Sequence, residues 1–220
     1  MSRTIVIGDI HGCLKALDAV LRAVNLQSDD TLVTIGDYVD RGPDSKGVIE
    51  RLIGLKDQVN LVPLLGNHEE MMLESLDKHA EPYGWFLHGG STTMESYGFE
   101  GDMSVVPPSH LEFLRELKPY HETSTHFFIH ANYDPRLPLA EQPPKLARWV
   151  KLTERIPGPH QSGKKAVVGH THDPEGQIFR LPHLTCIDTY CYGGRWLTAM
   201  DLQSNAIWQA TPEGQLIASP

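Results

Sequence analysis

The sequence predicts one α/β domain in which helices flank two β-sheets. Its 220 residues lie within the usual size range of a single domain, about 100–250 residues. Strand-then-helix units fill residues 3–77, and short strand-like runs return after residue 126. The composition, 40% hydrophobic and 21% charged, is that of a globular protein and excludes an intrinsically disordered chain.

The strand-then-helix units predict a sheet with parallel strands that is covered by helices. Apolar runs that stop at polar, glycine-containing segments indicate the strands, at residues 3–7, 31–35 and 59–65. A helix is expected after each run, at residues 14–24, 48–55 and about 69–77. In the first two helices, apolar side chains recur at helical spacing and would pack back onto the sheet.

The second half of the chain is less regular. Residues 81–120 are rich in glycine, serine, proline and aromatic residues, with a clear helix only at 110–117, so we expect a cap-like insertion within the single domain of residues 1–220. Short apolar runs predict strands at residues 127–129, 166–168, 178–181, 184–187, 197–200 and 206–208. Their length and turn spacing favour a second, more antiparallel sheet. The proline-rich, basic residues 135–159 would form a long functional loop with one short helix.

Charge, hydropathy and cysteine content exclude several classes of protein. A net charge of −9 argues against a general nucleic-acid binder, although not against a small phosphorylated substrate. No apolar run approaches the ~20 residues of a membrane helix, and the first residues lack a signal-peptide profile, so we expect no membrane partner and a cytoplasmic location. Cys13, Cys186 and Cys191 form no CxxC pair and should be reduced thiols.

Polar residues of metal-binding type follow the predicted strands. The segments are GDIHG at 8–12, GDYVDRG at 36–42, GNHE at 66–69, IHAN at 129–132 and GHTH at 169–172. Open α/β sheets bind ligands at the carboxyl ends of their strands, so these segments should meet at one place. Five strand ends that all carry Asp, Asn or His by accident would be a very unusual coincidence. The pattern therefore predicts a metal site.

The motifs GDIHG, GDYVDRG and GNHE, in this order and spacing, resemble the phosphoprotein phosphatase branch of the calcineurin-like metallophosphoesterases. Residues 85–97, which include Gly89, Gly90, Thr93, Ser96 and Tyr97, resemble the bacterial and phage members of that branch. The resemblance extends from residue 5 to about 202 and is loose at 99–125 and 135–159. It implies two mixed β-sheets packed as a sandwich and flanked by helices.

The resemblance also implies two divalent metal ions. Asp9, His11 and Asp37 would bind the first ion, and Asp37 would bridge to a second ion that is also bound by Asn67, His130 and His170. His172 stands where close relatives often have proline, and it would complete the shell of the first ion. Mixed oxygen and imidazole ligands suit Mn²⁺, Fe or Zn²⁺ better than Ca²⁺; we expect Mn²⁺, with Fe or Zn²⁺ as alternatives.

The implied reaction is direct attack on phosphorus by a hydroxide that bridges the two ions, without a phosphoenzyme. His68 would protonate the leaving group, Asp40 would orient its imidazole, and Arg41 would bind the phosphoryl oxygens by a two-point contact. Asn67 would contact the substrate as well as metal.

A second phosphate-binding arginine usually follows a tryptophan in this family, and here the assignment stays open. The sequence is Arg148-Trp149-Val150-Lys151, which places a lysine at the expected position. A lysine lacks the two-point contact of a guanidinium, so Arg148 or Arg155 could take that role in place of Lys151.

We therefore expect a dinuclear-metal-dependent phosphomonoester hydrolase, of the bacterial or phage serine/threonine protein phosphatase type, whose substrate is a phosphorylated protein or a small phosphoester. The alternative is a symmetrical diadenosine tetraphosphatase, which shares the three motifs but is typically longer. A non-catalytic binding module is a third hypothesis. It is disfavoured because every expected ligand and the acid are present.

Overall fold

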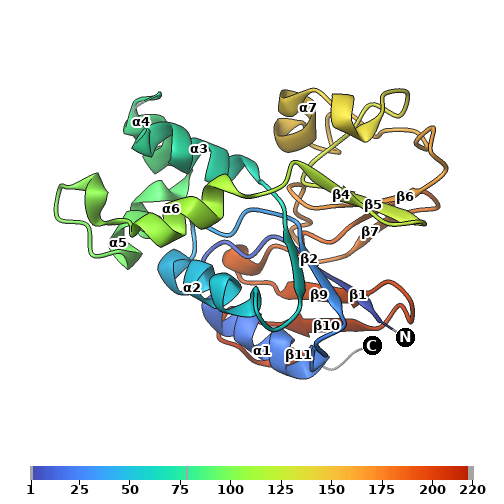
Figure 1. Cartoon of the computed structure of the whole chain (residues 1–220), viewed down its shortest axis with the longest axis horizontal. Helices are drawn as coiled ribbons and strands as arrows, with labels where there is room; N and C mark the ends of the chain where they lie inside the picture. The colour runs from blue at the N-terminus through green and yellow to red at the C-terminus, as the bar shows by residue number, and fades with distance from the viewer. Residues whose placement is uncertain (1, 78, 218–220) are drawn as a thin grey trace.

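The computed structural model describes residues 2–77 and 79–217, which form two mixed β-sheets packed face to face (Figure 1). The first sheet has the strand order β11-β10-β9-β1-β2-β3, and the second has the order β4-β5-β6-β8-β7. Val6, Val33, Phe128 and Val167, from strands of both sheets, share one buried cluster between them. The expected sandwich of two mixed sheets is confirmed.

In the first sheet, β1, β2 and β3 run parallel, and β9 pairs antiparallel with β1. The strands are β1 Thr4–Ile7, β2 Thr31–Thr34, β3 Asn60–Pro63, β9 Leu197–Asp201, β10 Ile207–Ala210 and β11 Leu216–Ile217. Side chains of a strand alternate between its two faces. Val6 accordingly points between the sheets, whereas Ile5 and Ile7 pack with Leu17 and Val20 of a covering helix.

The second sheet departs from the expected antiparallel arrangement. Its strands are β4 Tyr120–Glu122, β5 His126–Ile129, β6 Lys165–Val168, β7 Phe179–Leu181 and β8 Leu184–Cys186. β5, β6 and β8 are parallel, and only the edge strands β4 and β7 pair antiparallel with their neighbours. Strands β9 and β10 were also expected here but extend the first sheet. The prediction from turn spacing was wrong because residues 130–164 form a crossover between β5 and β6, and this connection is long enough for the two strands to run parallel.

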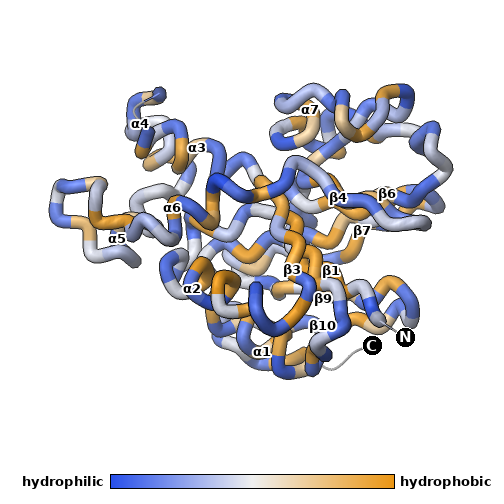
Figure 2. Tube along the Cα trace, viewed as in Figure 1, coloured by the Kyte–Doolittle hydropathy of each residue, from blue (hydrophilic) through white to orange (hydrophobic). Residues whose placement is uncertain are grey.

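Helices α1 Leu14–Val24, α2 Ser45–Leu55 and α3 Asn67–Leu76 follow the three parallel strands as expected. Hydrophobic residues concentrate along the central strands and hydrophilic residues on the outer turns (Figure 2). The Asp44 side chain caps α2 by accepting a hydrogen bond from the Gly47 N–H at 2.8 Å. No helix within residues 2–77 and 79–217 is both long and apolar enough to cross a bilayer.

The segment expected to be a cap-like insertion is more helical than its sequence indicated. It contains α4 Pro82–Trp85, the π-helix η1 Phe86–Gly90, α5 Ser91–Ser96, the 3₁₀ turn η2 Met103–Val105 and α6 Pro108–Arg115. Its α4 contacts α3, and its α5 and α6 contact α2. Trp85, Met94 and Phe113 join the hydrophobic cluster beneath the first sheet, so tertiary packing stabilises helices that two glycines disfavour locally.

The long loop at residues 135–159 contains the short turn η3 Leu139–Glu141 and the helix α7 Pro144–Trp149. Leu139 and Ala147 pack on the outer face of the second sheet, in a cluster with Phe127 and Val168. A further turn, η4 Cys191–Gly193, joins β8 to β9 and lies beside the site described next. The three cysteines are buried and form no disulfide among the described residues.

Candidate active site

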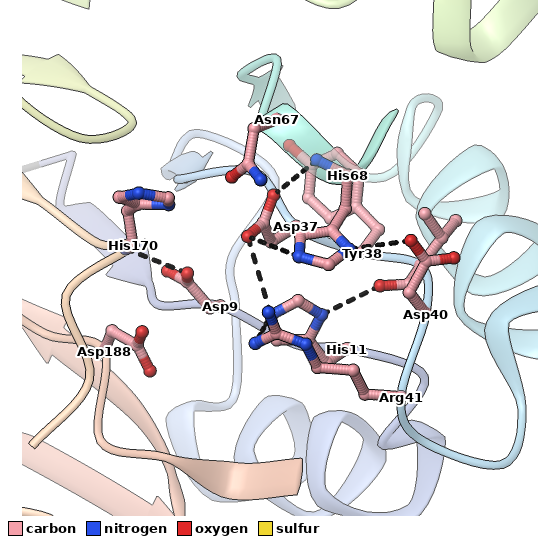
Figure 3. Close-up of polar contacts among 12 residues, drawn as sticks. Asp9, His11, Asp37, Tyr38, Asp40, Arg41, Asn67, His68, His170 and Asp188 are labelled. Carbon is pink, nitrogen blue, oxygen red and sulfur yellow. Dashed lines mark hydrogen bonds and ion pairs between the residues drawn. The ribbon is translucent and has the colours of Figure 1, made fainter. Parts of the chain in front are cut away.

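Polar side chains converge where the parallel strands of both sheets end (Figure 3). Asp9 and His11 follow β1, Asp37 follows β2, and Asn67 and His68 begin α3 after β3. From the second sheet, His130 follows β5 and His170 follows β6. The structure therefore brings together residues from all five motifs, which are up to 161 positions apart in the sequence.

Asp37 lies at the centre of this group. Its Oδ2 is 3.5 Å from His11 Nε2, and its Oδ1 is 3.4 Å from His130 Nε2. Among the described residues, two sets have ligand atoms within 4.8 Å of one another: His11, Asp37 and His68, and Asp37, His130 and His170. Both sets share Asp37, which is the arrangement that a carboxylate bridging two ions requires. The first set contains His68 in place of the expected Asp9.

Backbone contacts fix which nitrogen of each imidazole faces the centre. His11 Nδ1 is 2.8 Å from the Val39 carbonyl and His130 Nδ1 is 2.9 Å from the Ile35 carbonyl, so both donate from Nδ1 and turn Nε2 towards Asp37. His170 uses Nε2 to contact the Trp149 carbonyl at 3.0 Å, which leaves its Nδ1 available. Such second contacts are typical of metal-binding histidines.

The polar atoms at the site are not fully satisfied by the described residues. Asp9 accepts the His170 N–H through Oδ2, while its Oδ1 is buried without a hydrogen-bond partner. His130 Nε2 faces two acceptors, Asp37 and Asn67 Oδ1, the latter at 3.1 Å. A cation among these atoms would satisfy all of them, so the residues fit divalent metal ions.

The electrostatics of the buried groups agree with this fit. Burial and the neighbouring Asp188 raise the pKa of Asp9, and burial with the charge of Asp37 raises the pKa of Asp188 to about 6. Burial alone would lower the pKa of His130, but the Asp37 carboxylate raises it to about 10. Buried carboxylates therefore crowd together here, and a bound cation would relieve their repulsion. Asp188 carried no motif that would have identified it from the sequence.

His68 and Asp40 form a buried pair on the other side of Asp37. His68 Nδ1 donates to Asp40 Oδ2 at 2.7 Å, and both side chains are almost fully buried. This contact leaves His68 Nε2, 3.9 Å from Asp37 Oδ2, to face the centre of the site. The pair has the geometry expected of a general acid and the carboxylate that orients it.

The Arg41 guanidinium, half-buried beside the pair, contacts no carboxylate within 4.0 Å among the described residues. It lies 4.5 Å above the ring of Tyr192, and its Nη1 is 3.4 Å from His11 Nε2. Tyr192, in turn, packs edge-on against His11, with ring centroids 4.7 Å apart. Arg41 is thus an available cation beside the candidate metal ligands, and Tyr192 is a neighbour that no sequence signal singled out.

The basic loop residues differ in how they are paired. Arg148 forms an ion pair with Glu70, and the exposed Arg155 lies 3.5 Å from Asp134. Lys151 forms no ion pair with a described residue. Its segment borders the site, because the Trp149 carbonyl contacts His170 Nε2 at 3.0 Å and the Leu152 N–H donates to Thr171 Oγ1 at 2.9 Å. Burial and the charge of His130 lower the pKa of His170, and burial and Lys151 lower that of His172.

His172 lies outside both sets of ligand atoms. Its ring stacks on Tyr190, with centroids 4.2 Å apart and an interplanar angle of 12°. Burial, Lys151 and Arg41 lower its pKa. In this structure the imidazole is packed against an aromatic ring.

Glu69, the last residue of GNHE, holds together the turns that carry the site residues, a function that its sequence motif did not specify. Its fully buried carboxylate accepts hydrogen bonds from the N–H groups of Asp37, Tyr38, Val39 and Gly66. Because these bonds join the turn after β2 to the turn after β3, Glu69 fixes Asp37 relative to Asn67 and His68. Its place within a metal-site motif was the only signal of this function.

Gly36 is required where these turns meet. Its φ of 107° lies in the region that favours glycine, and a Cβ atom there would be 2.7 Å from the Gly66 nitrogen and 2.9 Å from His130 Nδ1. The glycine before Asp37 thus allows two turns and an imidazole to approach closely.

Comparison with known proteins agrees with this geometry. A family model described as calcineurin-like phosphoesterase matches residues 2–208. Serine/threonine-protein phosphatase 1 of Salmonella typhimurium is 31% identical over 132 residues, which is 58% of each chain. A symmetrical bis(5'-nucleosyl)-tetraphosphatase of Nitrosomonas europaea is 30% identical over 153 residues, 69% of this chain and 52% of that one. The matches therefore span little more than half the length of these relatives.

Solved structures show the same fold. One of a proposed diadenosine tetraphosphatase has a TM-score of 0.72 at 25% identity and covers 95% of this chain and 93% of its own. A cold-active protein-tyrosine phosphatase of a psychrophile Shewanella sp. has a TM-score of 0.67 at 14% identity and covers 99% and 80%. Because the family model extends over nearly the whole chain and the motifs converge on one group of residues that could hold metal ions, the protein belongs to the calcineurin-like phosphoesterase family.

Proposed function

We propose that this protein is a dinuclear-metal-dependent phosphomonoester hydrolase and, more specifically, a serine/threonine protein phosphatase. The observation that carries the substrate class is the pairing of the cations around the site. Arg41 and Lys151 have no acidic partner among the described residues, whereas Arg148 and Arg155 are paired with Glu70 and Asp134. Two available cations suit the charge of a single phosphoryl group better than that of the four linked phosphates of a dinucleoside tetraphosphate.

The ion-binding residues that we propose are Asp9, His11 and Asp37 for the first ion and Asp37, Asn67, His130 and His170 for the second, while His68 keeps the role of the acid. Bound divalent cations, for which we propose Mn²⁺, would supply activation of a water molecule and neutralisation of phosphoryl oxygens. His172 stays a candidate ligand of the first ion, which its imidazole could reach only by leaving the stack on Tyr190.

The side chains of this protein would divide the remaining tasks. Arg41 would bind two phosphoryl oxygens through its guanidinium, and the Tyr192 ring beneath it limits its movement. His68 would donate the proton on Nε2 to the departing alkoxide, because its Nδ1–H is already donated to Asp40. Lys151 would contribute a second positive charge, from a segment whose Trp149 carbonyl and Leu152 N–H contact His170 and Thr171.

The alternative function is hydrolysis of dinucleoside polyphosphates. It is favoured by the similarity to symmetrical tetraphosphatases and to the structure of a proposed diadenosine tetraphosphatase. Against it, the net charge of −9 repels polyanions at low salt, and the basic loop that would offset this repulsion has two of its arginines in ion pairs.

The deciding experiment compares kcat/KM for phosphoserine and phosphothreonine peptides with that for diadenosine tetraphosphate, at saturating Mn²⁺. We expect the peptides to be at least about tenfold better substrates, a difference of about 1.4 kcal/mol. Asp37→Asn, which removes the shared carboxylate charge, serves as the inactive control for contaminating phosphatases. A higher kcat/KM for the dinucleotide would make the alternative the correct function.

A further inference from the structure

The Asp40 carboxylate is held by more than its histidine partner. Trp85 donates its indole N–H to both carboxylate oxygens, at 3.0 and 2.9 Å, and Thr93 donates its hydroxyl to Oδ1 at 2.7 Å. Together with His68 Nδ1, three different side chains donate to one buried carboxylate. Two of them come from the helical segment that follows α3.

The backbone of Asp40 is bound by the same segment. Its N–H donates to Thr93 Oγ1 at 2.8 Å and to Ser45 Oγ at 3.0 Å. The Thr93 hydroxyl therefore accepts from the main chain of Asp40 and donates to its side chain, which closes a ring of hydrogen bonds. The next N–H, that of Arg41, donates to the Gly89 carbonyl at 3.3 Å.

The turn that these contacts fix is a strained one. Asp40 and Arg41 have φ values of 73° and 70°, in the left-handed region that costs a non-glycine residue about 1–2 kcal/mol. Trp85 can reach Asp40 only because position 90 is glycine, since a Cβ atom there would lie 2.5 Å from the indole ring. The contacts therefore need residues at positions 85, 90 and 93 together.

We propose that Trp85 and Thr93 are positioning residues, which fix the rotation of the Asp40 carboxylate and, through it, the orientation of the His68 imidazole. This inference rests on the proposed function, because it assigns a role in proton donation by His68. The physical reason is that a carboxylate with one donor can rotate, whereas one with three donors in fixed directions has a single satisfied orientation. Small errors in the placement of an acid cost up to about 10²-fold in rate.

The kinetic test compares substrates that differ in their need for an acid. Thr93→Val removes the hydroxyl and keeps the shape of the side chain, whereas Trp85→Phe removes the indole N–H together with one ring of a buried side chain. With Mn²⁺ present, we expect kcat for a poor leaving group, an alkyl phosphate or phosphoserine peptide, to fall by roughly 10- to 100-fold. With p-nitrophenyl phosphate, which needs little protonation, the fall should be much smaller. Thr93→Ser, which keeps the hydroxyl, should have a kcat close to that of the wild-type protein with both substrates.

Matched controls are available away from Asp40. Trp208→Phe makes the same change in β10, and Thr31→Val removes a hydroxyl that accepts from Asn60 at the opposite end of β2. Both should leave the ratio of the two rates unchanged. Equal losses with both leaving groups in Trp85→Phe and Thr93→Val, or a loss of bound metal, would indicate a structural role and overturn the proposal.

A second measurement does not depend on turnover. In metal-free protein labelled with ¹⁵N-histidine, the Nδ1–H of His68 should give a downfield proton signal that exchanges slowly with water. Trp85→Phe and Thr93→Val should shift this signal and accelerate its exchange, and Thr93→Ser should not. Unchanged exchange in both variants would overturn the proposal. If the wild-type protein fails to hydrolyse phosphomonoesters, the proposed function fails, while this spectrum still tests the positioning.

Discussion

Replacing Glu69 with glutamine should lower the free energy of unfolding, because two of the four backbone N–H groups that Glu69 binds would lose their acceptor. Glu69 Oε1 accepts from the N–H groups of Tyr38 and Val39 at 2.7 and 3.2 Å, and Oε2 accepts from those of Asp37 and Gly66 at 2.9 and 3.1 Å. A glutamine keeps one oxygen and replaces the other with an NH₂ group that cannot accept. Burial and the charge of Asp37 raise the pKa of Glu69 to about 7, so at a pH above this value two buried N–H groups lose bonds to a charged acceptor, at about 1.5–3 kcal/mol each.

The expected loss is about 3–6 kcal/mol of the roughly 5–15 kcal/mol that stabilise a typical domain. For a chain of this length, 1 kcal/mol corresponds to roughly 2–4 °C, so Tm should fall by about 6–24 °C. Thermal unfolding of the metal-free protein, followed by circular dichroism, measures this shift. Glu74→Gln is the matched control, because Glu74 is exposed on the same helix. A Tm for Glu69→Gln equal to that of the control would refute the reasoning.

Four further outcomes are expected at the site. Chelation should abolish turnover and Mn²⁺ should restore it, so full activity in metal-free protein would contradict the mechanism. His68→Asn should lower kcat by roughly 10²–10⁴ with metal content nearly unchanged, and less so for nitrophenyl esters. His170→Ala should raise the Mn²⁺ concentration for half-maximal activity at least roughly tenfold, and His172→Ala much less because that ring stacks on Tyr190. Lys151→Ala should raise KM about tenfold with little change in kcat, which substrate titration measures.

Local sequence patterns predicted the framework well because hydrophobic period and polar strand ends are short-range signals. The helix expected at residues 14–24 begins and ends as α1 Leu14–Val24, and the three parallel strands differ from expectation by one or two residues at their ends. Local sequence patterns did not predict secondary structure where packing against residues distant in the sequence stabilises it. Glycines 89 and 90 suggested irregular chain, yet α4, η1 and α5 form there because Trp85 and Met94 are buried against the body of the protein.

In the candidate site, too, local motifs predicted some features, and the tertiary fold decides the others. Motifs identified the residues that surround Asp37, because each lies directly after a strand and strand ends must meet. They did not reveal which basic residues are available, since the ion pair of Arg148 with Glu70 spans 78 positions. Nor did they assign a role to Trp85 or Thr93, which reach Asp40 from 45 and 53 positions away. Pairings of this kind follow from the tertiary fold alone.

Backbone strain around the candidate metal ligands explains why so many supporting bonds are needed. His11, Asp37, Asp40, Arg41 and His170 all have φ values between 45° and 73°, each at a cost of about 1–2 kcal/mol relative to an ordinary conformation. These turns place side chains from successive strands towards one point, which extended backbone would not do. Bonds within the protein hold them there: the N–H of His11 donates to the Asp37 carbonyl at 2.8 Å, while Glu69 and Thr93 bind the turns that follow. These bonds lie within the protein and hold the candidate ligands and the acid in position, while a bound cation would relieve the repulsion between the buried carboxylates of Asp9 and Asp188.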